Sequence, residues 1–415
     1  IGVLHALERA IAGLDLTRLD VYVGISAGAM VTSALANGIT PERMRHAFIR
    51  GDDPAIAMRP EVVFMPAVGE YARRALKLPG TTVRALVRHM MNAADISLAG
   101  ALSELATVLP TGVFDNAPLE RHLARVFSME GRTNSFTELP ARLRVLAVDV
   151  DSSKLVAFGE PGWDHVPISR AVQASTALPL LYCPVEIDGR WYIDGVARRT
   201  LNASLALAAG VDLLFCVNPI VPIDLERIRA SGRREMRSLV DRGLWAVASQ
   251  TFRTVIHSRM RTGFKNYEYM YPGANLVLIE PEMDEDRMFF SNIFSFSNRA
   301  RIWELGYASA CAQLLRDADR LEPLLRSFGL RLRRRFLEEG ACVDAAERRR
   351  EARGAGHFSA GSAHATLGRL EAALGRLDRS TGAQDAIAVP AGARRRAGAA
   401  AGVASPGDVA RGVVR

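Results

Sequence analysis

Residues 21–36 read VYVGISAGAMVTSALA and carry the strongest structural signal in the chain. A β-prone run from Val21 to Val23 leads into Gly24-Ile25-Ser26-Ala27-Gly28, and a run with helical spacing continues from Ala27 to Ala36. A G-x-S-x-G pattern between a strand and a helix is typical of a sharp turn that exposes the serine hydroxyl above a sheet. The order of strand, turn and helix therefore predicts an α/β protein with a serine nucleophile.

The residues around Ser26 have predicted roles of their own. We expect Gly24 and Gly28 to be required, because a side chain at either position would crowd the turn. The following helix points its first amide groups at the same place, so the amide of Ala27 is a candidate donor to an oxyanion. The alternative is a chance match in a chain with 34 glycines, and the strand and helix around the pattern argue against it.

A serine nucleophile needs a base, and an aspartate is the best candidate. The eight histidines offer no compelling base, since most lie in helix-like sequence or a loop. Asp194-Gly195 ends the β-prone run from Trp191 to Ile193, at a sheet edge of the kind where α/β proteins place their sites. A carboxylate there can accept the serine proton, which predicts a Ser26–Asp194 pair. Asp188 also precedes a glycine, but Asp188-Gly189 fits a two-residue hairpin turn and needs no catalytic role.

The rest of the chain as far as Val221 alternates helical and β-prone segments. Leu143 to Val150 and Leu155 to Phe158 predict a strand pair, and Ser169 to Ala177 predicts a short helix. Val211 to Val217 is a continuous apolar run, as in a strand covered on both faces.

Two long amphipathic stretches, Pro60 to Leu109 and Ile228 to Arg261, interrupt this alternation. Each is a candidate cap over a site, and the alternative is an outer helix with arginines facing water. We expect Ala391 to Arg415, which is mostly Ala, Gly, Val and Arg, to be disordered. The predicted division is a main domain over 1–345 with a helical cap at 60–110, a helical extension over 346–386 and a disordered tail over 387–415.

Composition excludes several classes of protein. The chain has 415 residues, of which 49% are hydrophobic and 24% charged, so it can form a sizeable core. The net charge of +8 comes almost entirely from arginine, which we interpret as compositional bias and not as a nucleic-acid footprint. Four scattered cysteines without a CxxC argue against a disulfide scaffold or a zinc site. The chain contains no run of about 18 uncharged apolar residues, so we do not expect an integral membrane protein. The scattered cysteines favour a reducing compartment, and we expect a cytoplasmic or peripheral-membrane protein, with export as the alternative.

Several motifs follow one another as they do in patatin-like phospholipases, and the chain resembles that family. The motifs are Gly2-Val3-Leu4 with Ala6-Leu7-Glu8, Val23 to Ala29, Ala174 to Pro179 with Pro184, and Ile193-Asp194-Gly195. The resemblance covers about Ile1 to Pro222 and continues more weakly to about Leu325. It implies a three-layer α/β/α sandwich with a mostly parallel central sheet, related to the α/β-hydrolases. It places Ser26 as nucleophile and Asp194 as base, and it implies no metal or organic cofactor.

The sequence departs from the family pattern at two places. The family's glycine-rich oxyanion loop lies just before the helix that begins here at Ile1, so we expect most of the oxyanion hole to lie outside this chain. Each missing donor costs on the order of a hundredfold to a thousandfold in rate, which predicts an impaired or inactive fragment. After Asp194 the sequence continues Gly195-Val196-Ala197-Arg198-Arg199, where the family usually has a second glycine, and this indicates a divergent subgroup.

The predicted function is cleavage of fatty acyl esters of lipids, as in a phospholipase A or lipid acyl hydrolase. One alternative is a Ser-Asp-His esterase with His257 as base. Another is an inactive lipid- or membrane-binding module on the same fold. The expected partners are a lipid ester and a membrane surface. Met65 to Ala94, which mixes apolar side chains with cations such as Arg73, Arg74 and Arg84, is the predicted contact with that surface.

Overall fold

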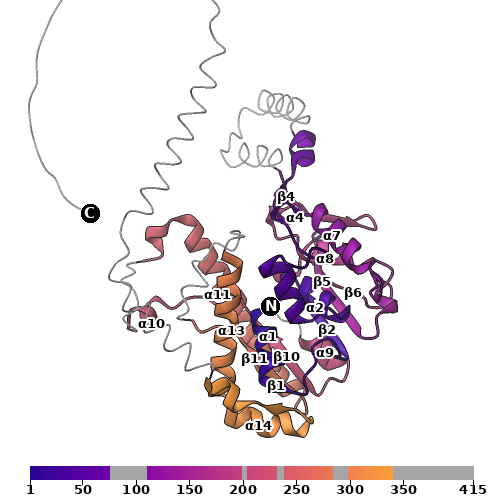
Figure 1. The fold of residues 1–415 in the computed structure, drawn as a ribbon. Coiled ribbons are helices and arrows are strands. Elements are labelled where there is room, and N and C mark those ends of the chain that lie inside the picture. The colour runs from indigo at the N-terminus through magenta and orange to yellow at the C-terminus, as the bar shows by residue number, and fades with distance from the viewer. Residues whose placement is uncertain (75–109, 199–202, 231–237, 284–297, 340–415) are drawn as a thin grey trace, which may run out of the picture. The chain divides into compact units, whose positions relative to one another are not determined.

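The computed structural model describes residues 1–74, 110–198, 203–230, 238–283 and 298–339 (Figure 1). The predicted extension at 346–386 and tail at 387–415 lie outside these residues, as does the predicted cap beyond residue 74. In the part of the chain that is described, no helix is both long and apolar enough to cross a membrane.

A five-stranded mixed sheet forms the centre of the fold, with the strand order β2-β5-β9-β8 and with β6 also paired to β5. Its strands are β2 (Val21–Ile25), β5 (Arg142–Asp149), β6 (Leu155–Phe158), β8 (Val185–Ile187) and β9 (Arg190–Asp194). The expected strand pair around the turn at 150–154 is confirmed as β5 and β6, which are antiparallel. The α/β class predicted from the sequence is also confirmed.

The expectation of a mostly parallel sheet is wrong for this part of the fold. Within the described residues of the five-stranded sheet, β2 and β5 are parallel, while β5–β6, β5–β9 and β8–β9 are antiparallel. For β5–β6 and β8–β9 the physical reason is the short connection, since strands joined by a tight turn can only pair antiparallel. A separate parallel pair is formed by β10 (Leu213–Val217) and β11 (Asn275–Ile279).

The register of β5 brings two strand ends together. Val145 and Leu146 pair with β2 and also with β6, so these two strands lie on opposite edges of β5. Ala147 and Val148 pair with β6 and with β9, which places β9 on the same edge as β2. Because Ile25 pairs with Leu146 and the last residue of β9 pairs with Ala147, the carboxyl ends of β2 and β9 meet on that edge.

The turn predicted at Asp188-Gly189 is confirmed. It joins β8 to β9, with Ile187 paired to Arg190. Both turn residues have positive φ, 51° for Asp188 and 72° for Gly189, as a two-residue hairpin turn of this kind requires.

Helices cover this sheet. The helix predicted over Ala27 to Ala36 is α2 (Ala27–Ala36), which packs on β2 and β5. The predicted short helix is α8 (Ile168–Ser175), which packs on β5 and β9 and is covered by α7 (Ala117–Phe127). Phe127, Leu146 and Ile168 are fully buried between these elements.

The C-terminal part of the described chain returns to its start. Helix α13 (Arg299–Arg316) lies beside α1 (Gly2–Ala10) (Figure 1). Strand β12 (Arg331–Leu332) pairs with β1 (Ile11–Ala12). The helix expected in the second amphipathic stretch is α11 (Leu244–Met270).

The remaining elements are short helices and strands, together with the longer helix α14. They are α3 (Pro41–Met44), η1 (Arg45–Arg50), α4 (Pro60–Val63), β3 (Met65–Pro66), β4 (Gly112–Asp115), η2 (Phe136–Glu138), β7 (Leu180–Tyr182), η3 (Gly195–Ala197), α9 (Ala203–Ala208), α10 (Leu225–Ala230), η4 (Val240–Arg242) and α14 (Ala318–Ser327).

Candidate active site

Ser26 occupies the turn between β2 and α2 in a strained backbone conformation. Its φ is 57° and its ψ is −132°. A positive φ is rare for residues other than glycine and costs on the order of 1–3 kcal/mol. The surrounding fold therefore holds Ser26 in a geometry that the residue alone would not adopt, and such strain is concentrated at functional sites.

The two glycines of the turn differ in what surrounds them. A Cβ on Gly24 would lie 2.2 Å from Thr32 Oγ1 and 2.5 Å from the Cα of Ala29, so only glycine lets α2 pack this closely on β2. A Cβ on Gly28 would meet nothing within 4 Å. The crowding expected at Gly28 is therefore absent, because this residue sits in the exposed first turn of α2 and faces open space.

Asp194 lies at the end of β9, where that strand meets the end of β2. Its side chain is fully buried, and Oδ1 accepts a hydrogen bond from the Val196 amide at 2.9 Å. Oδ2 is buried without a hydrogen-bond partner. Burial raises the pKa of Asp194 to about 6, and the nearby Ser26 hydroxyl and the Val196 amide oppose that rise. The carboxyl group thus lies beside the serine with one oxygen free to accept a proton.

Gly195 permits the close approach of these strand ends. A Cβ on Gly195 would lie 2.6 Å from the carbonyl oxygen of Leu146 and 3.2 Å from Ile25 Cγ2. Since both neighbours belong to the paired strands β2 and β5, a side chain at this position would push the Asp194 backbone away from Ser26.

The amide groups around Ser26 divide into two sets. The amide of Ser26 itself donates to Ser175 Oγ at 2.9 Å, and the amide of Ala29 donates to the Ser26 carbonyl at 2.9 Å. Ala27 and Gly28 are exposed, and amides in a first helical turn have no partner within the helix. The candidate oxyanion donors on this helix are therefore Ala27 and Gly28.

Ser175 has no role in the prediction from the sequence, although it lies in the Ala174 to Pro179 motif. In the structure Ser175 is fully buried and contacts the Ser26 turn directly. The motif is the feature that could have indicated this residue, since its serine is the last residue of α8.

The other two residues considered as a base, His257 and Asp188, each pair with a residue other than Ser26. His257 Nε2 is 3.6 Å from Glu280 Oε2, which pairs it with a carboxylate other than Asp194. Asp188 is exposed and its carboxylate lies 2.9 Å from His165. Among the described residues, no group of three or more His, Cys, Asp or Glu could hold a metal ion.

Comparisons with known proteins give a family for the first part of the chain. The family model for patatin-like phospholipases matches residues 1–207, which include both Ser26 and Asp194. A solved structure, VipD from Legionella pneumophila, is similar with 15% identity and a TM-score of 0.31. That similarity covers 75% of this chain and 63% of VipD, so it spans less than two thirds of the VipD chain. No curated protein matches the sequence. Residues 1–207, which include the strained serine turn and the aspartate at the end of β9, are a patatin-like phospholipase domain.

Proposed function

We propose that this protein is a serine acyl hydrolase of the phospholipase A or lipid acyl hydrolase type, with Ser26 as nucleophile and Asp194 as base. The observation that carries the proposal is the meeting of β2 and β9 on one edge of β5. It sets a strained serine beside a buried carboxylate whose Oδ2 has no other partner. Family membership supports lipid acyl hydrolysis in general.

In the proposed reaction, Ser26 Oγ attacks the ester carbonyl and its proton passes to Asp194 Oδ2. The amides of Ala27 and Gly28 stabilise the oxyanion. When the tetrahedral intermediate collapses, the leaving alcohol takes the proton from Asp194, and an acyl-enzyme remains on Ser26. Asp194 then accepts a proton from water, which attacks the acyl-enzyme, and it returns that proton to Ser26 Oγ as the fatty acid is released. A pKa of about 6 suits this role, because the carboxyl group is ionised at neutral pH and still binds a proton well.

Activity of three variants tests the assignment. We expect Ser26→Ala and Asp194→Asn to abolish ester hydrolysis while the protein stays folded. Asp188→Asn is the matched control, since it also precedes a glycine, and we expect it to keep most activity. Greater damage from Asp188→Asn than from Asp194→Asn would reverse the two assignments.

The alternative with a histidine base has less support. His257 faces Glu280, so we expect His257→Ala to leave ester hydrolysis largely intact. A loss comparable to that of Asp194→Asn would favour a Ser-Asp-His esterase. In the full-length protein, a folded wild type without any ester hydrolase activity would favour the inactive lipid-binding module.

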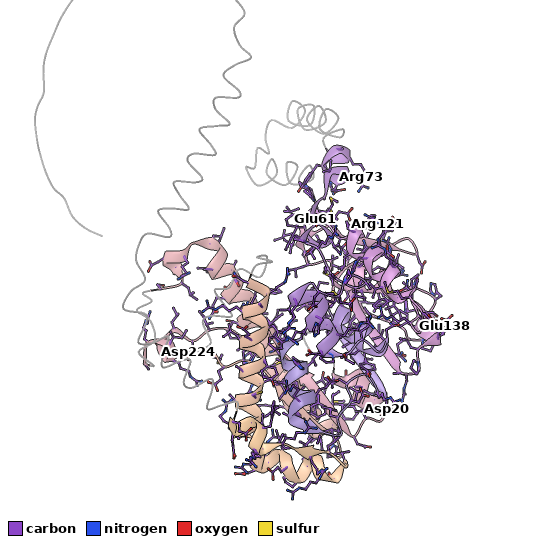
Figure 2. The ribbon with its side chains drawn as sticks, viewed as in Figure 1. Asp20, Glu61, Arg73, Arg121, Glu138 and Asp224 are labelled. Atoms are coloured by element: carbon purple, nitrogen blue, oxygen red, sulfur yellow. The ribbon has the colours of Figure 1, made fainter. Side chains whose placement is uncertain are left out.

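We also propose a lipid-facing surface beside the site, formed by apolar side chains around β3, β4 and β7. Its exposed members are Met65, Val68, Val113 and Leu180. The neighbouring Arg73 and Arg74 share one carboxylate, that of Glu70, at 2.8 Å and 2.9 Å, which balances one of their two charges. Arg73 and the exposed Glu61 are labelled in Figure 2. Arg84, another part of the sequence-based prediction, lies outside the described residues. The contact is therefore proposed to be mainly apolar and only weakly sensitive to salt.

Leu180 gives the sharpest test of this surface. It is 79% exposed with φ 71°, in a turn closed by the bond from the Leu181 amide to the Leu178 carbonyl at 3.1 Å. Asparagine tolerates this φ better, so Leu180→Asn should stabilise the fold while weakening sedimentation with phosphatidylcholine vesicles, measured in a Ser26→Ala background.

Phe328→Asn, at an exposed apolar residue after α14, is the control. Equal binding by Leu180→Asn and wild type would contradict the proposal, as would an equal loss of binding in Phe328→Asn.

A further inference from the structure

The hydroxyl of Ser175 connects three elements beneath the proposed nucleophile. Ser175 is the last residue of α8 and is fully buried. Its Oγ accepts the hydrogen bond from the Ser26 amide at 2.9 Å and donates its own proton to the carbonyl oxygen of Leu146, on β5, at 2.6 Å. The hydroxyl therefore ties the turn after β2 to the end of α8 and to the central strand.

The same short segment also holds the proposed base. The carbonyl oxygen of Ala177, two residues after Ser175, accepts a hydrogen bond from the Asp194 amide at 3.0 Å. The segment is itself fixed by the buried Asn116, whose Nδ2 donates to the Gln173 carbonyl at 2.8 Å and lies 3.3 Å from Thr176 Oγ1. Ser175 to Ala177 thus contacts the backbone of both Ser26 and Asp194.

We propose that Ser175 is the positioning residue of this site, and that the segment from Ser175 to Ala177 sets the spacing between the Ser26 hydroxyl and the Asp194 carboxylate. This inference rests on the proposed function. Ser175 does not relay a proton, because its hydroxyl proton is donated to Leu146 and it accepts from an amide. Its role is to hold the Ser26 backbone at φ 57°.

Removal of the hydroxyl should act on the reactivity of Ser26 more than on ester binding. In Ser175→Ala the Ser26 amide loses its acceptor and the Leu146 carbonyl loses a donor in a dry region, and such unpaired groups are unfavourable. The turn can then relax from its strained φ, which moves Oγ away from Asp194. Because Ser175 is fully buried beneath the turn, we expect kcat to fall at least tenfold with little change in KM.

Ser169 provides a matched control on the same helix. It is also fully buried, and its Oγ accepts from Asn134 Nδ2 at 3.0 Å and donates to Glu120 Oε1 at 2.9 Å. Ser169→Ala therefore removes two comparable side-chain hydrogen bonds from α8 without touching the Ser26 turn. A loss of stability alone should affect both variants in the same way.

The experiment measures the rate of Ser26 labelling by a fluorophosphonate, together with kcat and KM on a soluble short-chain ester, at a temperature where circular dichroism shows each variant folded. We expect Ser175→Ala to label at least tenfold more slowly than wild type, and Ser169→Ala to label within about twofold of wild type. If Ser175→Ala does not fold, Ser175→Cys takes its place, because it keeps the shape and weakens both hydrogen bonds. We then expect a smaller loss in the same direction.

Equal labelling rates for the Ser175 variant and wild type would overturn the positioning role. A raised KM with unchanged kcat would do the same, as would an equal slowing in Ser169→Ala. Failure of the folded, full-length wild type to label at Ser26 would overturn the proposed function together with this inference, whereas failure of this inference alone leaves the labelling of the wild type intact.

Discussion

Single residues around the serine turn have different steric requirements, although the sequence pattern treats them alike. A Cβ on Gly24 would overlap the backbone of α2, whereas one on Gly28 would meet only open space. The pattern G-x-S-x-G therefore contains one glycine required for packing and one that packing does not explain.

This difference predicts opposite effects on stability. Gly24→Ala should lower the free energy of unfolding by about 1–3 kcal/mol, because the new methyl group forces α2 away from β2. Gly28→Ala should leave stability unchanged or raise it by up to about 1 kcal/mol, since alanine favours the helix. Urea denaturation of both variants measures the effects, and a Gly28→Ala variant as unstable as Gly24→Ala would contradict the packing described here.

The buried carboxyl group of Asp194 predicts a pH dependence. Its pKa in the folded protein is raised to about 6 from an ordinary value of 3.8. The base must be ionised, so kcat/KM should rise with pH through about 6. A pH–rate profile that is flat from pH 5 to pH 8 would contradict the role of Asp194.

The raised pKa of Asp194 also makes the stability of the fold depend on pH. Between pH 4 and pH 6 the folded state binds a proton at Asp194 that the unfolded state has lost. The contribution of this proton to the free energy of unfolding is therefore fully present below about pH 4 and is lost as the pH rises through 6. Asp194→Asn should therefore gain stability relative to wild type at pH 7.5 and gain less at pH 4. Melting curves at the two pH values measure this difference.

The sequence could predict Ser26 and Asp194 as candidates because each stands at the end of a β-prone run, with Ser26 between two nearby glycines and Asp194 directly before Gly195. It could not predict the role of Ser175, because the hydroxyl acts on partners 149 and 29 residues away, at Ser26 and Leu146. Such a contact exists only once three separate elements are packed together.

At the scale of elements, local turn chemistry was more informative than family analogy. Asp188-Gly189 indicated an antiparallel hairpin, which the structure contains. The mostly parallel sheet came from the resemblance, and it fails where tight turns join β5 to β6 and β8 to β9. The helix over Ala27 to Ala36 was predicted with its observed bounds, because its start is marked by the strand-to-helix turn.

The hairpin between β8 and β9 gives a prediction at this scale. Gly189 has φ 72° and open space around it, so Gly189→Ala meets only backbone strain. We expect a loss of about 1 kcal/mol in stability and little change in kcat, since Asp194 is held separately by Ala177. A large loss of kcat without loss of stability would show that the turn itself acts in the reaction.

The folded unit of the whole molecule extends beyond the residues that the family model matches. β12 pairs with β1, and Leu337 is fully buried. α13 packs so closely on α1 that a Cβ on Gly2 would lie 2.2 Å from the Trp303 carbonyl oxygen. The sequence could not predict the pairing of β1 with β12, because two-residue strands leave no periodic signal.

This arrangement predicts how truncations behave. A chain that ends at residue 207 should not unfold cooperatively, since α1 and β1 lose their partners. A chain that ends at residue 345 should melt within about 5 °C of the full chain. Thermal denaturation followed by circular dichroism measures both, and a cooperative transition in the shorter chain would contradict the closure of the fold by α13 and β12.

The pairing of Ser26 with Asp194 is tested most directly by mapping the site of fluorophosphonate labelling by mass spectrometry in the wild type and in Asp194→Asn. We predict a single modified residue, Ser26, in the wild type, and at least a hundredfold slower modification of the folded Asp194→Asn variant. Modification of a different serine, or labelling of Ser26 at the same rate in both proteins, would contradict a serine activated by this aspartate.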